Sequence, residues 1–211
     1  MHTDRRVMSV DFKNSETKDN LMRAFAGESQ ARNRYTFAAA QSQKNGLHVI
    51  SAIFAFTASQ EKEHAEIFYN HLKEMAGETI FIDGGYPVDI SEDISELLSM
   101  AQHNEYEEHE PIYKAFGEKA REEGFERVAA SFFHIAEIEK IHGDRFGRYA
   151  RLLKEGKLFV ADMEIEWMCL NCGFVYKGKN APAICPVCQH EQGYFIRFEF
   201  VPFEDGKHVS S

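Results

Sequence analysis

The chain contains 211 residues, of which 44% are hydrophobic and 27% are charged, which is enough for one sizeable core and a small second module. It contains no run of about 18 apolar residues, and residues 1–13 lack the apolar stretch of a secretory signal, which predicts a soluble, cytoplasmic protein with no membrane partner. The formal net charge of −10 argues against nucleic acid as a partner.

Four long helices are expected, and together they predict an all-α four-helix bundle. Helical periodicity, caps such as Ser15 and stops such as Gly46 place them at about residues 15–44, 48–75, 91–124 and 125–154. The short connection through Gly46 makes the first two helices antiparallel. Residues 77–92 contain Gly84-Gly85 and Pro87, and we expect an extended link long enough to cross the bundle from end to end.

Pro111 lies inside the third predicted helix, one turn after Glu108. A proline removes one backbone donor and clashes with the preceding turn. We therefore expect a kink within a turn of Glu108, unless two shorter helices abut there.

Polar residues interrupt the apolar stripes of two of these helices. Glu61 and His64 are three residues apart on the stripe that should face the core, and Glu139 and His142 repeat this arrangement. A buried carboxylate and imidazole must find charge compensation or destabilise the fold. A shared metal ion would supply that compensation.

The spacing of these residues indicates an internal repeat. Glu28 precedes Glu105 by 77 residues, and both members of the first Glu-x-x-His precede their counterparts by 78. One Glu-x-x-His is a weak signal. Two helices with a Glu and two with Glu-x-x-His form the ligand set of ferritin-like di-iron or di-manganese bundles. The alternative is a set of buried polar residues that satisfy one another without metal.

These residues and their surroundings resemble the rubrerythrin family over about residues 14–200. The segments that carry the resemblance are FAGESQARNRY at residues 25–35, QEKEHA at 60–65, EYEE at 105–108 and REEGF at 121–125. Pro111 departs from the family's third helix, which bears on the geometry at Glu108.

The resemblance implies a ligand set for two non-haem irons, bridged by Glu61 and Glu139. It implies that one iron moves between Glu108 when oxidised and His64 when reduced. It also implies that Tyr35 and Tyr113 hydrogen-bond to ligand carboxylates, although both could equally be core aromatics. The six ligands of the oxidised state would be Glu28, Glu61, Glu105, Glu108, Glu139 and His142.

The C-terminal part forms a second module, because the helical period stops at Gly156. Two Cys-x-x-Cys pairs separated by 12 residues predict a tetrahedral four-sulfur site for iron or zinc. Spacing alone favours a zinc ribbon equally, but Gly173 and Pro186 resemble the knuckles of rubredoxin. The expected parts are an extension at 1–13, a bundle at 14–156, a linker at 157–166 and a β-rich rubredoxin-like domain at 167–211, with ligands Cys169, Cys172, Cys185 and Cys188.

The combined sites predict a peroxidase of the rubrerythrin type, which reduces hydrogen peroxide to water. Glu61, Glu108, His64, Tyr35 and Tyr113 are its candidate catalytic residues, and the four-sulfur iron would return electrons one at a time. Because no Gly-x-Gly-x-x-Gly follows a predicted strand, the electrons should come from an external NAD(P)H-dependent reductase or a rubredoxin.

Two other functions are open from the sequence. One is a ferroxidase for iron handling with a structural zinc ribbon, and the other is an adaptor whose ribbon docks partners. Glu108 favours the peroxidase, since a storage ferroxidase needs no redox-switching carboxylate. Manganese in the bundle and dioxygen as the substrate also stay open.

Helix length favours electron transfer between the chains of a homodimer, alone or within a higher oligomer, and the family resemblance implies a head-to-tail arrangement. From His142 to Lys154 the fourth helix extends about 18 Å beyond the expected di-iron site. The linker could span roughly 40 Å if extended, but folding back would leave it without a regular hydrogen-bonded partner. In a two-fold dimer with antiparallel bundles, the C-terminal module of one chain would lie beside the di-iron site of its partner.

Overall fold

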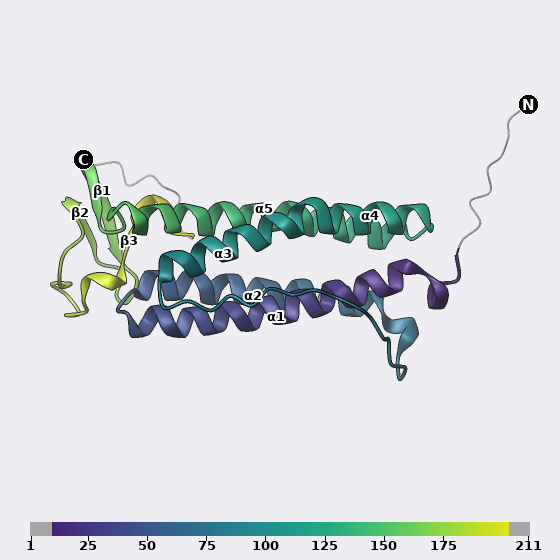
Figure 1. Cartoon of the computed structure of the whole chain (residues 1–211). Coiled ribbons are helices and arrows are strands. Elements are labelled where there is room, and N and C mark those ends of the chain that lie inside the picture. The colour runs from purple at the N-terminus through teal and green to yellow at the C-terminus, as the bar shows by residue number, and fades with distance from the viewer. Residues whose placement is uncertain (1–9, 203–211) are drawn as a thin grey trace, which may run out of the picture.

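The computed structural model describes residues 10–202, which form a long helical bundle with a small three-stranded unit at one end (Figure 1). None of the described helices is long and apolar enough to cross a membrane. The helices are α1 (Glu16–Lys44), α2 (His48–His71), α3 (Ile94–Glu107), α4 (Tyr113–Glu122) and α5 (Glu126–Lys154). Short 3-10 turns occupy Phe12–Asn14, Lys73–Met75, Gln192–Tyr194 and Phe198–Phe200.

The helix ends follow the signals in the sequence. Ser15 caps α1 by accepting a hydrogen bond from the Lys18 amide at 3.1 Å, and Asp93 caps α3 by accepting one from the Ser95 amide at 2.7 Å. Gly46 has a φ of +69° after α1, a conformation that glycine adopts readily. The turn at Gly46 reverses the chain, so α1 and α2 form the expected antiparallel pair (Figure 1).

The third predicted helix is divided next to Glu108, as the proline predicts. A wide π-type turn over Glu108–Ile112 separates α3 from α4, and Glu110 leaves helical geometry with φ −155° and ψ 118°. The Glu110–Pro111 peptide bond is cis. Both forms of the expectation are therefore present, because a kink and two abutting helices occur at one place.

Residues 79–92, called here the crossing segment, run beside α1 from the end of α2 back to the start of α3 (Figure 1). Successive side chains of α1 hold it: Arg23 contacts Asp83, Arg34 contacts Asp89, and Gln41 donates to the Ser91 carbonyl at 2.7 Å. The segment thus crosses the bundle, as its length and glycines predict.

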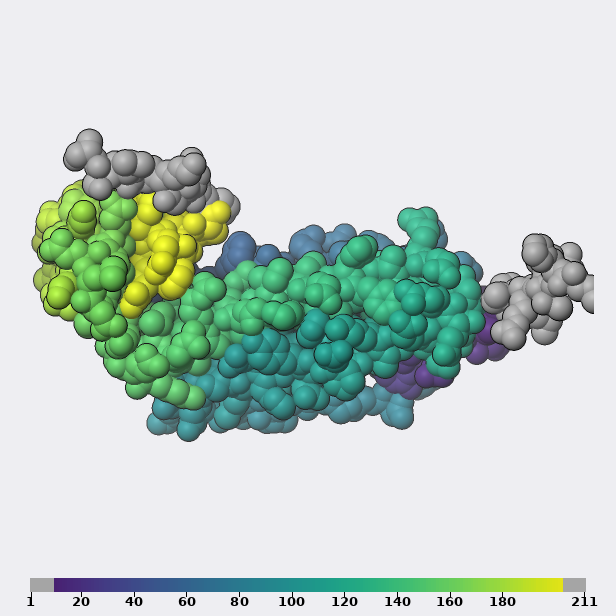
Figure 2. Space-filling model, turned by 90° about the horizontal axis from the view of Figure 1, so that it is seen from above, coloured from purple at the N-terminus to yellow at the C-terminus, as the bar shows by residue number. Residues whose placement is uncertain are grey.

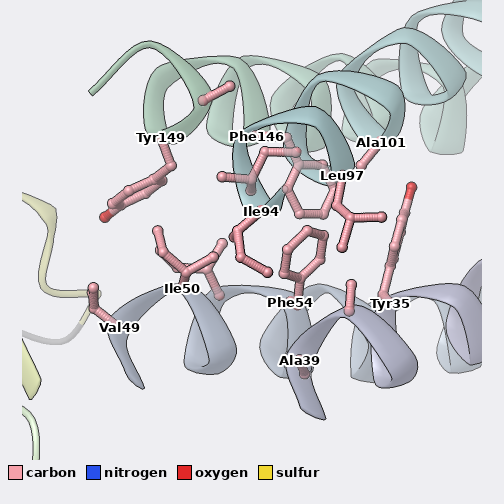
Figure 3. Close-up of a cluster of buried hydrophobic side chains, with 14 of the residues drawn as sticks. Tyr35, Ala39, Val49, Ile50, Phe54, Ile94, Leu97, Ala101, Phe146 and Tyr149 are labelled. Atoms are coloured by element: carbon pink, nitrogen blue, oxygen red, sulfur yellow. The ribbon is translucent and has the colours of Figure 1, made fainter. Parts of the chain in front are cut away.

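The bundle core consists of two apolar clusters. The first surrounds Phe54 and Phe146, toward the three-stranded unit (Figure 3). The second surrounds Phe68 and Phe132, toward the opposite end. Each fully buried side chain of this size contributes roughly 1.5–3 kcal/mol to folding. Glu61 follows Phe54 by seven residues and precedes Phe68 by seven, so a polar layer lies between the clusters.

The C-terminal unit, called here the tail, is an antiparallel sheet of strand order β2-β1-β3. The strands are β1 (Val160–Cys169), β2 (Val175–Asn180) and β3 (Phe195–Arg197). Trp167 on the central strand faces Tyr176 on one side and Arg197 on the other. β1 begins at Val160, inside the predicted linker of residues 157–166, so most of that stretch belongs to the sheet.

The tail sits at the end of its own bundle (Figure 2). The ring of His48, the first residue of α2, stacks on Tyr194 at 3.9 Å between centroids, and its Nε2 lies 2.9 Å from Glu191 Oε1. The backbone of Gly193 packs against Gly46, where an added Cβ would lie 1.7 Å from the Gly46 carbonyl oxygen. This contact leaves no room for a side chain.

Candidate metal centres

Four helices deliver carboxylates and imidazoles to the polar layer. Glu28 comes from α1, Glu105 from α3, and each Glu-x-x-His from α2 or α5, so every pair points inward from one helix face. All six side chains are buried, with 5% exposure at His64 and 1% or less at Glu28, Glu61, Glu105, Glu139 and His142.

These side chains form two groups whose potential ligand atoms lie within 4.8 Å of one another. The groups share Glu61 and Glu139, the residues that the family resemblance implies as bridges. His64 Nδ1 lies 2.9 Å from one oxygen of Glu139, and His142 Nδ1 lies 2.9 Å from the other. The first group contains Glu28, Glu61, His64 and Glu139, and the second contains Glu61, Glu105, Glu139 and His142.

The unpaired atoms of this layer fit metal ions. Several buried oxygens, and both ring nitrogens of His142, have no hydrogen-bond partner among the described residues. The short contacts of His142 are thus ion-pair contacts without hydrogen-bond alignment. Unsatisfied buried polar groups are costly and rare in native proteins. Carboxylate oxygens with imidazole nitrogens are donors that iron accepts. The unpaired oxygens are Glu28 Oε2, Glu61 Oε1, Glu105 Oε2 and both oxygens of Glu139.

Burial and close carboxylates shift the pKa values of this layer in opposite directions. Burial raises the pKa of Glu28 well above its usual range, and burial with the nearby Glu61 charge raises the pKa of Glu105 to about 8. Burial alone would raise the pKa of Glu61, but interactions with His142 and His64 lower it to about 2. The metal-free layer therefore holds protons on some carboxyl groups near neutral pH.

The imidazoles respond in the reverse way. Burial alone would lower the pKa of His64, but contacts with Glu139 and Glu61 raise it to about 9. Burial is likewise outweighed at His142, whose neighbouring carboxylates raise its pKa to about 12. Protonated imidazoles thus provide the charge compensation that metal ions would otherwise supply.

Two buried tyrosines donate hydrogen bonds to carboxylates of the polar layer. The Tyr35 hydroxyl donates to Glu105, and the Tyr113 hydroxyl donates to Glu28 at 2.6 Å. Both rings also pack in the apolar clusters on either side of the polar layer. The two roles expected for these tyrosines, carboxylate partner and core aromatic, therefore coexist.

Glu108 lies apart from the two groups formed within residues 10–202. It occupies the first position of the turn after α3 and is half-buried. Burial raises its pKa well above the usual range. Of the two residues proposed to exchange, His64 is thus the one gathered with the other ligands.

The sequence interpretation overlooked two charged groups beside this layer. Arg145, three residues after His142 on α5, donates to Thr57 at 2.8 Å and to Gln60 at 3.0 Å. Its helical spacing from His142 was a usable signal. Asp89 of the crossing segment accepts hydrogen bonds from both Arg34 on α1 and Asn104 on α3. Its distance in sequence from either partner left no such signal.

The tail brings the four cysteines together. Cys169 and Cys188 lie 3.7 Å apart, as do Cys172 and Cys185, measured between sulfurs. All four sulfurs lie within 4.8 Å of one another, which suits a tetrahedral four-sulfur site.

Backbone amides next to both Cys-x-x-Cys pairs face these sulfurs. The amide of His190 donates toward Cys188 and lowers its pKa to about 6, whereas burial raises the pKa of Cys169 to about 12. Gly173 has a φ of +77°, which lets the first knuckle turn back on Cys169 through a 2.8 Å hydrogen bond from the Gly173 amide.

A four-helix bundle with a doubled Glu and Glu-x-x-His layer, joined to a four-cysteine tail, defines a ferritin-like protein with a rubredoxin-like domain. The family model described as Rubrerythrin matches residues 19–153, and the one described as Rubrerythrin, rubredoxin-like domain matches residues 167–196. The chain belongs to the rubrerythrin family.

Relatives extend over most of the chain. Rubrerythrin of Clostridium perfringens is 44% identical over 188 residues, which cover 89% of this chain and 96% of that protein. Rubrerythrin of Nitratidesulfovibrio vulgaris is 42% identical over 183 residues, which cover 87% and 94%. A structure of nigerythrin in a mixed-valence state is similar with a TM-score of 0.58 and 26% identity, covering 94% of this chain and 92% of that one.

Family membership, together with the donor sets described above, gives the chain the iron cofactors of this family: two ions in the bundle and one in the tail. It also makes the chain an oxidoreductase.

Proposed function

We propose that the protein is a peroxidase that reduces hydrogen peroxide to water at the bundle site, with electrons relayed through the tail. The observation that carries this proposal is the paired ligand arrangement, in which Glu61 and Glu139 belong to both groups. Such sharing suits two ions held together, and two ferrous ions can supply both electrons that cleavage of an O–O bond requires.

The residues of the chain would have separate tasks in this reaction. Glu28, Glu61, His64, Glu105, Glu139 and His142 would hold the two ions, and Glu108 would exchange with His64. Tyr35 and Tyr113 would orient Glu105 and Glu28, since each donates to one carboxylate oxygen and leaves the other free. Orienting partners of this kind are typically worth 10–100-fold in metal affinity or activity.

Peroxide consumption with a reduced donor tests the proposal. Iron-loaded protein should oxidise a reduced rubredoxin or an NAD(P)H-dependent reductase in step with added hydrogen peroxide. A Cys172→Ser variant should complete one turnover when its bundle is pre-reduced but should not cycle on the donor. Unchanged steady-state turnover of this variant would mean that the tail is not the relay.

We further propose that the electron crosses between chains in a head-to-tail homodimer. The tail docks at His48, and Glu61 lies 13 residues further along α2, which corresponds to about 20 Å along the helix axis. Each tail is thus held far from its own bundle site. An antiparallel partner would bring its bundle site to the tail through one isologous interface.

A further inference from the structure

A cavity of about 350 Å³ lies beside the polar layer, between α1, the crossing segment and the turn after α3. Glu108 and Tyr113 line it, and the Tyr113 hydroxyl contacts Glu28 at 2.6 Å. Tyr113 is 2% exposed, whereas Ile112 and Tyr86 are 36% and 41% exposed. The cavity therefore runs from a partly exposed rim to groups that touch the metal ligands.

The cavity is much larger than hydrogen peroxide requires. One water occupies about 30 Å³ of liquid, and hydrogen peroxide is only slightly larger. Pockets that hold small organic molecules span roughly 300–1,000 Å³ and combine apolar walls with a few convergent polar groups. Ala24, Pro87, Pro111 and Phe116 supply such walls here.

We propose that this cavity binds the hydrocarbon part of organic hydroperoxides, a second substrate class for the bundle site. The inference rests on the proposed peroxidase function and extends it. The hydroperoxide end would lie near Glu108 and Tyr113, where Gln30 and Asn104 add hydrogen-bonding groups to the lining. The alkyl or aryl group would contact the apolar walls, which offer nothing to hydrogen peroxide itself.

Gly27 keeps the inner part of the cavity open. It lies inside α1, where glycine costs about 1 kcal/mol relative to alanine. An added Cβ would lie 3.8 Å from the Tyr86 ring and 3.9 Å from the Tyr113 hydroxyl, which is ordinary contact. No clash therefore requires glycine, but any larger side chain would fill the space between these rings beside Glu28.

The crossing segment forms the outer wall of the cavity and is weakly attached to the bundle there, which allows a ligand larger than water to enter. Within residues 10–202, the backbone of the crossing segment forms no hydrogen bond with another backbone group. Near the cavity, this segment is held by Arg23, which pairs with the 93% exposed Asp83 side chain and donates to the Asp83 carbonyl at 3.1 Å, and by a 3.1 Å hydrogen bond from the Tyr86 hydroxyl to the Arg23 carbonyl. Exposed ion pairs contribute at most about 1 kcal/mol.

The reaction balances with the same electron supply. An organic hydroperoxide would accept two electrons from the ferrous pair, which becomes diferric, and two protons from solvent. Its O–O bond would break, one oxygen would leave as water, and the other would stay on carbon as an alcohol. The alcohol would depart through the cavity that held the hydrocarbon group.

Binding can be measured without turnover by using cumyl alcohol, the product expected from cumene hydroperoxide. Adding cumyl alcohol to metal-free protein should produce saturable NMR shifts at the amides of Gly27 and Ala115, which line the cavity. Gly27→Val should weaken this binding by about tenfold or more, because one excess methylene in an apolar pocket changes recognition by about 10–200-fold. Ala40→Val, at an exposed position of the same helix outside the cavity lining, is the matched control and should bind normally.

Turnover gives the second measurement. Wild-type protein should reduce cumene hydroperoxide, and Ala115→Phe, a change at an exposed lining position, should lower kcat/KM for cumene hydroperoxide by a much larger factor than kcat/KM for hydrogen peroxide. This variant also serves if Gly27→Val does not fold. Absent cavity shifts, or equal loss with both peroxides, would overturn the inference. Iron-loaded wild type that fails to reduce hydrogen peroxide would instead overturn the proposed function beneath it.

Discussion

Glu61 and His64 lie three residues apart on α2, yet their removal should have different effects. Glu61→Ala removes a member of both ligand groups and should lose metal and activity together. In the metal-free protein it breaks buried contacts with His64 and His142, at a cost of about 3–5 kcal/mol. His64→Ala should keep its metals when oxidised but turn over slowly.

Elemental analysis of the oxidised proteins and steady-state peroxide assays would check both variants. Equal metal loss in the two would reject the proposed exchange of Glu108 and His64.

Protons and metal ions compete for the polar layer. Burial and neighbouring charges raise the pKa of Glu105 from 4.5 to about 8, and nearby carboxylates raise the pKa of His64 from 6.5 to about 9 despite its burial. Both groups are therefore mainly protonated at pH 7 in metal-free protein, and metal binding should release protons. Adding ferrous ion in weak buffer should acidify the solution, and apparent affinity should rise with pH.

The same shifts predict how the stability of the metal-free protein depends on pH. A group whose pKa is higher in the folded than in the unfolded state stabilises the fold at low pH. The contribution of Glu105 to the free energy of unfolding should therefore be lost between about pH 4.5 and 8, and that of His64 between about pH 6.5 and 9. Thermal unfolding with and without chelator should therefore show Tm values that diverge as pH rises. Tm values that change in parallel with pH in the two samples would contradict the raised pKa values of Glu105 and His64.

At the residue scale, local spacing predicted the members of the polar layer because helical periodicity makes three-residue pairs share a face. Spacing could not predict the position of Glu108, which depends on how the chain turns at Pro111. It also could not find Asp89, whose contacts with Arg34 and Asn104 join a segment far from both in sequence.

At the scale of elements, helix boundaries were predictable where a cap or stop is local, as at Ser15 and Asp93. The start of strand β1 was less predictable, because buried and exposed side chains do not alternate in its first half and few of its positions there are buried. Its partner strand β2 lies beyond the first cysteine pair in the sequence. Val160 is a strand residue only because it pairs with Asn180 of β2.

Gly193 determines how the tail seats on the bundle. Gly193→Ala would place a methyl group against the Gly46 carbonyl, where backbone rather than a flexible side chain must yield, at about 1–3 kcal/mol. We expect the tail to undock while its iron site stays intact, which would lower donor-driven turnover. Small-angle scattering and the visible spectrum of the four-sulfur iron would measure these two effects separately.

Gly85→Ala is a suitable control, since no described atom outside its chain neighbours lies within 4 Å of the added Cβ. An undiminished donor-driven rate in Gly193→Ala, with altered scattering, would show that docking is not needed for the relay.

At the scale of the whole molecule, the relay can be tested by mixing two inactive variants. A dimer of one Glu61→Ala chain and one Cys172→Ser chain has an intact tail on the first chain and an intact bundle on the second. Transfer between chains should restore about half of the wild-type activity per dimer, because one of two relays is complete. Recovered peroxidase activity after subunit exchange would be the measurement.

As a control, neither the Glu61→Ala nor the Cys172→Ser protein alone should show donor-driven peroxidase activity. If the variants exchange subunits and stay inactive, while isolated wild-type monomers remain active, transfer occurs within one chain.

The tail also contains the only tryptophan of the chain. Trp167 is fully buried two residues before Cys169, its ring N–H donates to the Gly178 carbonyl at 2.9 Å, and the Arg197 guanidinium lies 5.3 Å from its ring. Tryptophan fluorescence therefore reports on the tail, whereas helical circular dichroism reports mainly on the bundle. Two optical signals can thus follow the unfolding of the electron-relay unit and of the metal-binding bundle independently in an unlabelled protein.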